Sequence, residues 1–281
     1  MARAQRRRRQ RRRRPARPRH RAEARRCPRV LRRLRRNRTV RCGRGRVGVR
    51  DMSLAHPTLE TDEIRDLNTE FETAQPAEIL AWAAKKFGHG LAVTSSFGDP
   101  ILAHLAWSTI PGIEVSLIDT QYLFAETIWY AKHLADRTSG NLRILTPASD
   151  VGRDDLWMRD TDLCCGVRKV APLEHMLANR SAWVTGLRRD DGPTRAQTPI
   201  VFHDVLRDVI KVNPIANWTD ADVASYMLDN DLPQHPLIDR GYSSIGCWPC
   251  TAPASDPNDK RAGRWAGQSK TECGLHGAPV N

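Results

Sequence analysis

The sequence predicts an α/β protein whose parallel sheet is flanked by helices, and three observations lead to this class. From about residue 76 onward, short apolar runs alternate with longer amphipathic stretches. The apolar runs are bounded by Gly, Ser, Asp or Pro, which is typical of strands buried on both faces. Because a helix follows nearly every strand, successive strands are expected to run parallel, with helices on both faces of the sheet.

Each element follows from a local pattern. The first helix begins after Pro76, and its amphipathic run AEILAWAAKKF ends before Gly88. Thr219 opens the last helix, and Asp222, three residues later, is its partner in a capping box. Further helices are expected over residues 100–107, 124–136 and 166–178. Strands are expected over residues 91–94, 113–118, 142–145 and 182–185, followed by a strand pair over 201–206 and 209–212.

The charge of the chain is divided between two regions. The sequence has 45 Lys and Arg against 32 Asp and Glu, a formal charge of +13, but residues 1–50 hold 24 of the basic residues, all Arg, and one acidic residue. Residues 51–281 therefore hold 21 basic and 31 acidic side chains, a net charge of −10. The sequence is a basic arm joined to an acidic body.

The arginine-rich arm, residues 1–51, is expected to be disordered, because like charges repel and few apolar side chains offset the chain entropy. It could bind nucleic acid or direct nuclear import, and a transit peptide is a second option, although residues 1–50 contain no serine. At Met52 the composition becomes that of an ordinary globular protein. We expect the protein to begin at Met52, the arm being a GC-rich upstream stretch read as coding sequence.

Several protein classes are excluded. No run approaches the roughly 18 apolar residues of a membrane-spanning helix, and the arm lacks the apolar core of a secretory signal. The seven cysteines are odd in number and accompany no export signal, which argues against a disulfide framework and for metal or thiol chemistry. A cytoplasmic location is therefore expected.

Four cysteines form two pairs, Cys164-Cys165 and Cys247-x-x-Cys250. A CxxC turn can direct two thiolates at one metal centre, and a second pair completes four ligands. CxxC alone also occurs in redox dithiols and half zinc sites, and any single cysteine could be a buried apolar residue. Because zinc sites usually use two spaced pairs, the tandem pair favours an iron–sulfur cluster. Cys27 and Cys42 lie in the arm and receive no role.

Cys273 lies in a Gly-rich C-terminal segment with several basic residues around it. Nearby cations lower the pKa of a thiol, and the thiolate is the nucleophilic form. From Asp239 onward apolar runs are few, so we expect a mobile tail or one ordered only on binding. Such a tail could carry the thiol into a site and out again, although an exposed thiol of no consequence has the same pattern.

Six motifs together resemble the assimilatory adenylylsulfate (APS) reductases, and the resemblance runs from about residue 70 to 276. The motifs are Cys164-Cys165-Gly-Val-Arg168-Lys169, Gly186-Leu-Arg188-Arg189, Thr194-Arg195, Ile245-Gly-Cys247-Trp-Pro-Cys250-Thr251, Gly263-Arg264-Trp265 and Glu272-Cys273-Gly-Leu-His276. The resemblance implies an adenine-nucleotide α-hydrolase-like fold and reduction of APS to sulfite and AMP, with thioredoxin as electron donor. It does not cover the arm.

The resemblance also implies roles for individual residues. The four paired cysteines, Cys164, Cys165, Cys247 and Cys250, would ligate one 4Fe–4S cluster, and Cys273 would be the nucleophile that forms an S-sulfocysteine. The anhydride of APS is surrounded by anionic oxygens that repel a thiolate unless cations neutralise them. The residues expected to bind substrate are Ser95, Ser96, Gly98, Asp119, Thr120, Lys169, Gly186, Arg195, Arg261, Arg264 and His276.

Two of these expectations rest on strand ends. The Ser95–Asp99 turn follows a strand and precedes a helix, where backbone N–H groups can hold an anion. Asp119-Thr120 ends the next strand, at the edge where open α/β sheets bind ligands. The family usually has glycine where this chain has Gln121, and glutamine does not easily adopt the positive φ that glycine permits.

The resulting prediction has three parts: the arm (1–51), an APS-binding α/β domain (52–245), and a C-terminal segment with the CxxC pair and the catalytic tail (246–281). An enzyme that uses 3′-phosphoadenylylsulfate (PAPS), or both nucleotides, is the alternative; relatives without the cysteine pairs use PAPS. An ATP-using relative would carry an SGGxDS loop, which SSFGDP does not match. A nucleic-acid-binding protein acting through the arm is the remaining alternative.

Overall fold

The computed structural model describes residues 58–256, 259–268, 270 and 272–276. The predictions on residues 1–51, including Cys27, Cys42 and the start at Met52, lie outside these residues. No helix within the described ranges is long and apolar enough to cross a membrane.

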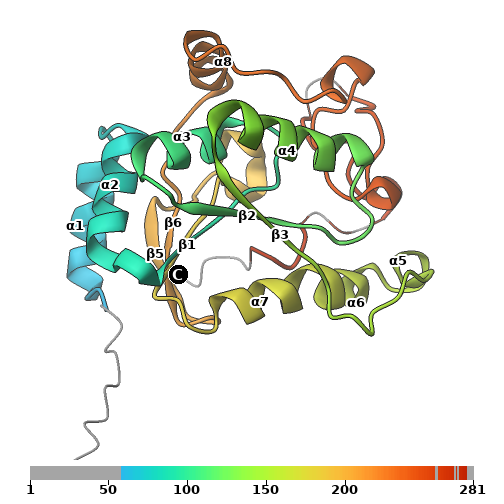
Figure 1. The fold of residues 1–281 in the computed structure, drawn as a ribbon, viewed down its shortest axis with the longest axis horizontal. Helices are drawn as coiled ribbons and strands as arrows, with labels where there is room; N and C mark the ends of the chain where they lie inside the picture. The colour runs from blue at the N-terminus through green and yellow to red at the C-terminus, as the bar shows by residue number, and fades with distance from the viewer. Residues whose placement is uncertain (1–57, 257–258, 269, 271, 277–281) are drawn as a thin grey trace, which may run out of the picture. The chain divides into compact units, whose positions relative to one another are not determined.

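Within residues 58–276, six strands form one sheet in the order β3-β2-β1-β4-β6-β5 (Figure 1). The strands are β1 (Leu91–Thr94), β2 (Glu114–Ile118), β3 (Asn141–Leu145), β4 (Ala182–Val184), β5 (Val201–Asp204) and β6 (Val209–Val212). All neighbours pair in parallel except β5 and β6, which are antiparallel. The predicted parallel sheet is confirmed, with one antiparallel edge strand, because the short connection after β5 can only form a hairpin.

The helices connect and cover these strands. They are α1 (Thr61–Phe71), α2 (Pro76–Phe87), α3 (Ile101–Thr109), α4 (Ala125–Thr138), α5 (Leu156–Arg159), α6 (Thr161–Cys165), α7 (Ala171–Leu177) and α8 (Asp220–Asp229). Residues 166–178, expected as one helix, contain a π-helical turn at Gly166–Val170 before α7. Thr219 and Asp222 form the expected capping box at α8. Helices α1, α5 and α6 were not expected.

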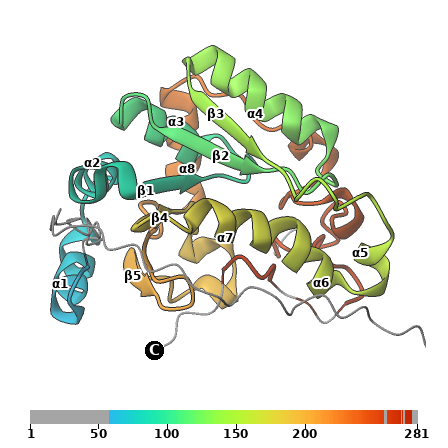
Figure 2. The same ribbon diagram turned by 60° about the horizontal axis from the view of Figure 1, so that its bottom comes forward.

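Strand side chains alternate between two cores. Leu91 and Val93 of β1, like Ala182 and Val184 of β4, pack with helices α2, α3 and α4. The intervening Ala92 and Trp183 pack on the other face, against Leu173 and Leu177 of α7. Figure 2 shows α7 and α6 on this face and α3 and α4 on the opposite one. Both faces are therefore buried, as a central parallel sheet requires.

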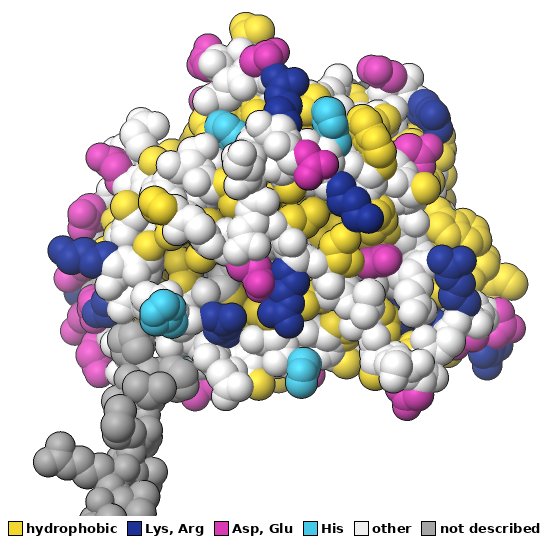
Figure 3. Space-filling view, viewed as in Figure 1, with side chains coloured by type: hydrophobic (Ala, Val, Ile, Leu, Met, Phe, Trp, Pro, Cys, Tyr) yellow, Lys and Arg dark blue, Asp and Glu magenta, His cyan; other side chains and the backbone are white. Residues whose placement is uncertain are grey.

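The sheet direction places three loops together. Because β1, β2 and β4 run parallel, the loops after Thr94, Ile118 and Val184 leave from the same edge. Parts of the C-terminal segment lie at this edge as well, since residues 243–246, Lys260, Arg261, Arg264, Cys273, Leu275 and His276 line the same cavity. On the face shown in Figure 3, side chains of both signs are scattered among apolar ones rather than gathered into a basic stripe.

Candidate active site

A cavity of about 570 Å³ lies at the carboxyl edge of the sheet. Its wall combines the loops after β1 and β4, part of α8, and residues from the C-terminal segment. Ten of the residues predicted to bind substrate or act on it line it: Ser95, Ser96, Gly98, Lys169, Gly186, Arg195, Arg261, Arg264, Cys273 and His276. The chain therefore brings together residues up to about 180 positions apart in sequence.

The loop after β1 is held by its own side chains. Ser95 Oγ accepts a hydrogen bond from the Phe97 backbone N–H at 3.1 Å, and Asp99 Oδ1 accepts one from the Ile101 N–H at 2.9 Å. Phe97 has a φ of 53° and is fully buried, so apolar packing holds this left-handed position. The turn thus directs Ser96 and Gly98 at the cavity.

Cys273 is the thiol of the cavity wall. Burial opposes its ionisation, but the Lys169 ammonium, the backbone N–H of Leu275 and the Arg264 guanidinium outweigh burial, so its pKa lies below that of an ordinary thiol. Lys169 and Arg264 have no ion-pair partner among the described residues. Their positive charge is therefore available to a thiolate and to a bound anion.

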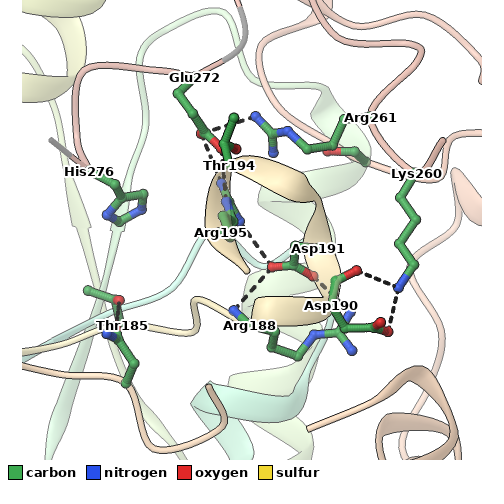
Figure 4. A network of polar contacts seen from close by, with 12 residues as sticks. Thr185, Arg188, Asp190, Asp191, Thr194, Arg195, Lys260, Arg261, Glu272 and His276 are labelled. Atoms are coloured by element: carbon green, nitrogen blue, oxygen red, sulfur yellow. Dashed lines mark hydrogen bonds and ion pairs between the residues drawn. The ribbon is translucent and has the colours of Figure 1, made fainter. Parts of the chain in front are cut away.

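Other cations of the cavity are already paired (Figure 4). Arg195 donates through Nε and Nη2 to the two carboxylate oxygens of Glu272, at 2.9 and 3.0 Å. Arg261 Nη2 donates to Glu272 Oε2 at 3.1 Å. Arg195 also contacts Asp191 at 3.0 Å. Glu272, the residue before Cys273, was not predicted to be part of the site.

His276 docks the end of the tail on the sheet. Its ring stacks on Trp183 of β4, with centroids 5.6 Å apart and an interplanar angle of 18°. Its Nδ1 lies 3.1 Å from Nζ of Lys211, a lysine 1% exposed. Burial lowers the pKa of Lys211 to about 8, and burial together with the Lys211 charge lowers the pKa of His276 well below its usual range. A neutral His276 imidazole that accepts a hydrogen bond from Lys211 is consistent with the lowered pKa of both groups.

The four paired cysteines line a second, narrower cavity together with Lys169, so this lysine lies on both cavities. All four are free thiols. No three His, Cys, Asp or Glu side chains in the described ranges are arranged to hold a single metal ion. Burial raises the pKa of Cys164 to about 11, and the charges of Cys165 and Cys247 add to the effect. Four thiolates in one such space need a compensating positive charge.

Backbone pairing holds the two cysteine segments in place. The tandem pair ends α6, directly before the π-helical turn. Cys247 pairs with Leu123 in an isolated bridge, and a second bridge joins Thr251 to Arg264. The Trp265 N–H donates to the Cys250 carbonyl at 3.0 Å. Because of these contacts, the CxxC turn lies between the loop after β2 and the Arg264 segment.

Two predicted residues take other positions. Thr120 lines the cysteine cavity, where its Oγ1 hydrogen-bonds Cys247 Sγ at 3.1 Å. Asp119 Oδ1 accepts from the Gln121 N–H at 2.8 Å, and neither Asp119 nor Thr120 lines the larger cavity. Residues missed from the sequence include Arg188, Asp191 and Lys260, which line that cavity. Arg188 belongs to the motif Gly186-Leu-Arg188-Arg189, but the motif does not show that Arg188 forms an ion pair with Asp191.

Gln121 adopts a left-handed backbone conformation, which glutamine was not expected to adopt easily. Its φ is 67°, and its Oε1 accepts a 2.8 Å hydrogen bond from Nη1 of Arg168. Arg168 is 1% exposed, lines the cysteine cavity, and stacks over the Tyr122 ring at 4.7 Å. The strained backbone of Gln121 is thus accompanied by a hydrogen bond from its side chain to a buried cation.

Comparison with known proteins matches this chain to one family. The model of the phosphoadenosine phosphosulfate reductase domain matches residues 90–253. The adenosine 5′-phosphosulfate reductase of Streptomyces coelicolor is 46% identical over 227 residues, covering 77% of this chain and 96% of the relative. That of Geobacillus thermodenitrificans is 42% identical over 234 residues, covering 79% and 99%.

Among solved structures, the phosphoadenylyl-sulfate (PAPS) reductase of Candida auris, in its phosphate complex, superposes with a TM-score of 0.61 and 28% identity. The superposition covers 70% of this chain and 99% of the Candida protein.

Proposed function

The chain belongs to the phosphoadenosine phosphosulfate reductase domain family, and from this premise we propose that it reduces APS to sulfite and AMP in sulfate assimilation. The observation that carries the proposal is the position of Cys273. A thiol of lowered pKa lines the nucleotide-sized cavity beside Lys169 and Arg264, two cations without ion-pair partners among the described residues. The relatives named for APS support APS as the nucleotide.

In the proposed first step the Cys273 thiolate attacks the sulfur of the sulfate group. A sulfur–sulfur bond forms, the bond from sulfur to the bridging oxygen breaks, and AMP leaves with that electron pair. Lys169 and Arg264 neutralise the oxygens around the sulfur, which would otherwise repel the thiolate, and they stabilise the charge that develops on the phosphate. The product on the protein is an S-sulfocysteine at Cys273.

In the second step a thioredoxin thiolate attacks the Cys273 sulfur, and sulfite leaves with the electron pair of the sulfur–sulfur bond. The second thioredoxin thiol then resolves the mixed disulfide and regenerates Cys273. Thioredoxin supplies the two electrons and ends as a disulfide. The tail must expose Cys273 for this step, so the contacts of Glu272 and His276 must open. Such thiol exchange agrees with a cytoplasmic location.

We further propose that Cys164, Cys165, Cys247 and Cys250 hold one 4Fe–4S cluster. All four line one cavity, yet no three described ligand side chains converge on a single ion. Four cysteine thiolates are the ligand set of such a cluster, so these residues would hold it. When bound, the cluster would supply the compensating charge for the thiolates beside Lys169.

A substrate assay tests the proposed reaction. Anaerobically purified protein with thioredoxin should release sulfite from APS and far less from PAPS at equal concentration. PAPS is the second candidate, because the family model and the Candida auris structure carry that name. Sulfite release confined to PAPS would contradict the proposal.

Iron analysis tests the cluster. Cys247→Ser should lose iron and activity together, since three thiolates remain for four irons. The matched variant Cys273→Ser should retain iron while losing turnover. Full activity of Cys247→Ser without iron would refute the cluster.

A further inference from the structure

Glu272 occupies the position where an anionic ligand of this cavity would be expected. Its carboxylate accepts two hydrogen bonds from Arg195, one from Arg261 and one from Thr194 Oγ1, the last at 3.1 Å. The three charged side chains are only 15–21% exposed. Arginine binds this carboxylate in a bidentate manner, and it binds sulfate and phosphate groups with the same geometry.

We propose that the Glu272 carboxylate is a surrogate anion, which keeps Arg195 and Arg261 paired in the free enzyme and yields them to the terminal anionic group of the substrate. This inference rests on the proposed function, because it takes the cavity to bind an adenine nucleotide with a phosphosulfate group. It adds a competition between a residue of the tail and the substrate for the same two guanidinium groups.

The charges explain why such a surrogate is needed. The Arg195 guanidinium, removed from water and left without a carboxylate partner, would be strongly destabilising. Asp191 neutralises only part of this charge, since it also pairs with Arg188. With Glu272 in place both arginines are balanced, and replacing one anion by another leaves this balance unchanged. A ligand that displaces Glu272 therefore gains less than it would at arginines without this carboxylate, because the pairs with Glu272 must break first.

Chain connectivity makes the exchange matter for chemistry. Glu272 and Cys273 are consecutive, so their Cα atoms are about 3.8 Å apart and the thiol cannot stay fixed when the carboxylate moves. Beyond Cys273, His276 is held independently by Trp183 and Lys211. Displacing Glu272 therefore frees the chain on the N-terminal side of Cys273, while the C-terminal side stays docked through His276. Glu272 acts as a positioning residue for Cys273, not as a catalytic residue.

ADP is the probe for this competition, because its β-phosphate replaces the sulfate group of APS and offers no sulfur to attack. Its dissociation constant is measured by calorimetry on the cluster-loaded, full-length protein. Glu272→Gln removes the competing charge at nearly constant volume, and we expect it to bind ADP about tenfold more tightly than the parent protein. Glu272→Asp keeps the charge and should bind ADP like the parent. Glu70→Gln, on the exposed face of α1, is the control for net charge.

Steady-state kinetics with APS add a readout that a folding defect would not give. Glu272→Gln should lower the KM for APS and leave kcat near that of the parent protein, since bound substrate has displaced Glu272 in both proteins. Parent protein that binds ADP while Glu272→Gln binds it no more tightly would overturn the inference and leave the proposed function standing. So would equal tightening in Glu272→Asp. A parent protein that binds no ADP would refute the nucleotide cavity itself, and the inference with it.

Discussion

At the scale of single residues, the cations of the cavity differ in whether they already have a partner. Arg195 and Arg261 are engaged by Glu272, and Lys260 contacts Asp190 and Asp220 at 2.7 and 2.6 Å. Lys169 is not engaged in this way, and its pKa is raised: burial opposes its charge, but the charges of Cys247 and Cys273 favour it more strongly. It is therefore a charged side chain that supports the Cys273 thiolate.

The first prediction concerns Lys169→Met. Among the groups around Cys273, the Lys169 ammonium does most to offset the effect of burial, so the thiol pKa should rise when it is removed. As the pH falls, Lys169→Met should then lose its Cys273 thiolate at a higher pH than the parent protein does. Its alkylation by iodoacetamide should be lost at that higher pH as well. The kcat/KM for APS should drop about 100-fold, or about 2.7 kcal/mol, as when one transition-state donor is removed.

Lys132→Met, on the exposed side of α4, is the matched control. It should change neither the pH dependence of alkylation nor the kcat/KM for APS. If the alkylation profile of Lys169→Met overlies that of the parent protein, Lys169 does not set the pKa of Cys273.

The second prediction concerns Gln121→Gly. Glycine relieves the left-handed backbone but costs about 0.5–1 kcal/mol of chain entropy, so the two effects nearly cancel. What remains is the lost hydrogen bond to the buried Arg168, worth about 1.5–3 kcal/mol for a charged donor. We expect the free energy of unfolding to fall by about 1.5–3 kcal/mol in anaerobic denaturant titrations.

Ser139→Gly provides the contrast. Ser139 caps α4 at a φ of 53° and is exposed, and its side chain has no hydrogen-bond partner within the described part of the chain. Glycine there should be neutral or stabilising. A Gln121→Gly protein more stable than its parent would show that backbone strain, not the bond to Arg168, dominates at this position.

At the scale of elements, the pairing of the CxxC segment with the Arg264 segment holds the cysteines and the cations together. Gly263 lies at this contact, where a Cβ atom would collide with the Ala252 carbonyl oxygen. The Ala252 N–H in turn donates to the Gly263 carbonyl at 2.8 Å. Only glycine lets the two backbones approach this closely.

The third prediction follows from that contact. Gly263→Ala must separate the two segments, because the obstructing atom belongs to the backbone. Arg264 and Cys250 should both be displaced, so iron content and kcat/KM should fall together. Gly152→Ala, whose Cβ would meet nothing within 4 Å, should retain both. Parent-like iron and activity in Gly263→Ala would contradict this role of the pairing.

At the scale of the whole molecule, hydrophobic patterning predicted the strands and their order along the chain, because buried strands are contiguous apolar runs. Helix α1 was missed although Ile64, Leu67 and Phe71 have helical spacing, since its polar face lowers the apolar content. The motifs indicated which residues belong to the site. They could not indicate that Glu272 pairs with Arg195, because that contact depends on how the tail folds back on the sheet.

The central claim is that Cys273 accepts the sulfo group from APS before any electron donor acts. Mass spectrometry of the protein after incubation with APS, in the absence of thioredoxin, tests it most directly. We predict one added SO₃ group on the peptide that carries Cys273, lost with release of sulfite when reduced thioredoxin is added, and no adduct in Cys273→Ser. Sulfite release from APS and thioredoxin by the Cys273→Ser protein, or an adduct on another cysteine, would contradict this claim.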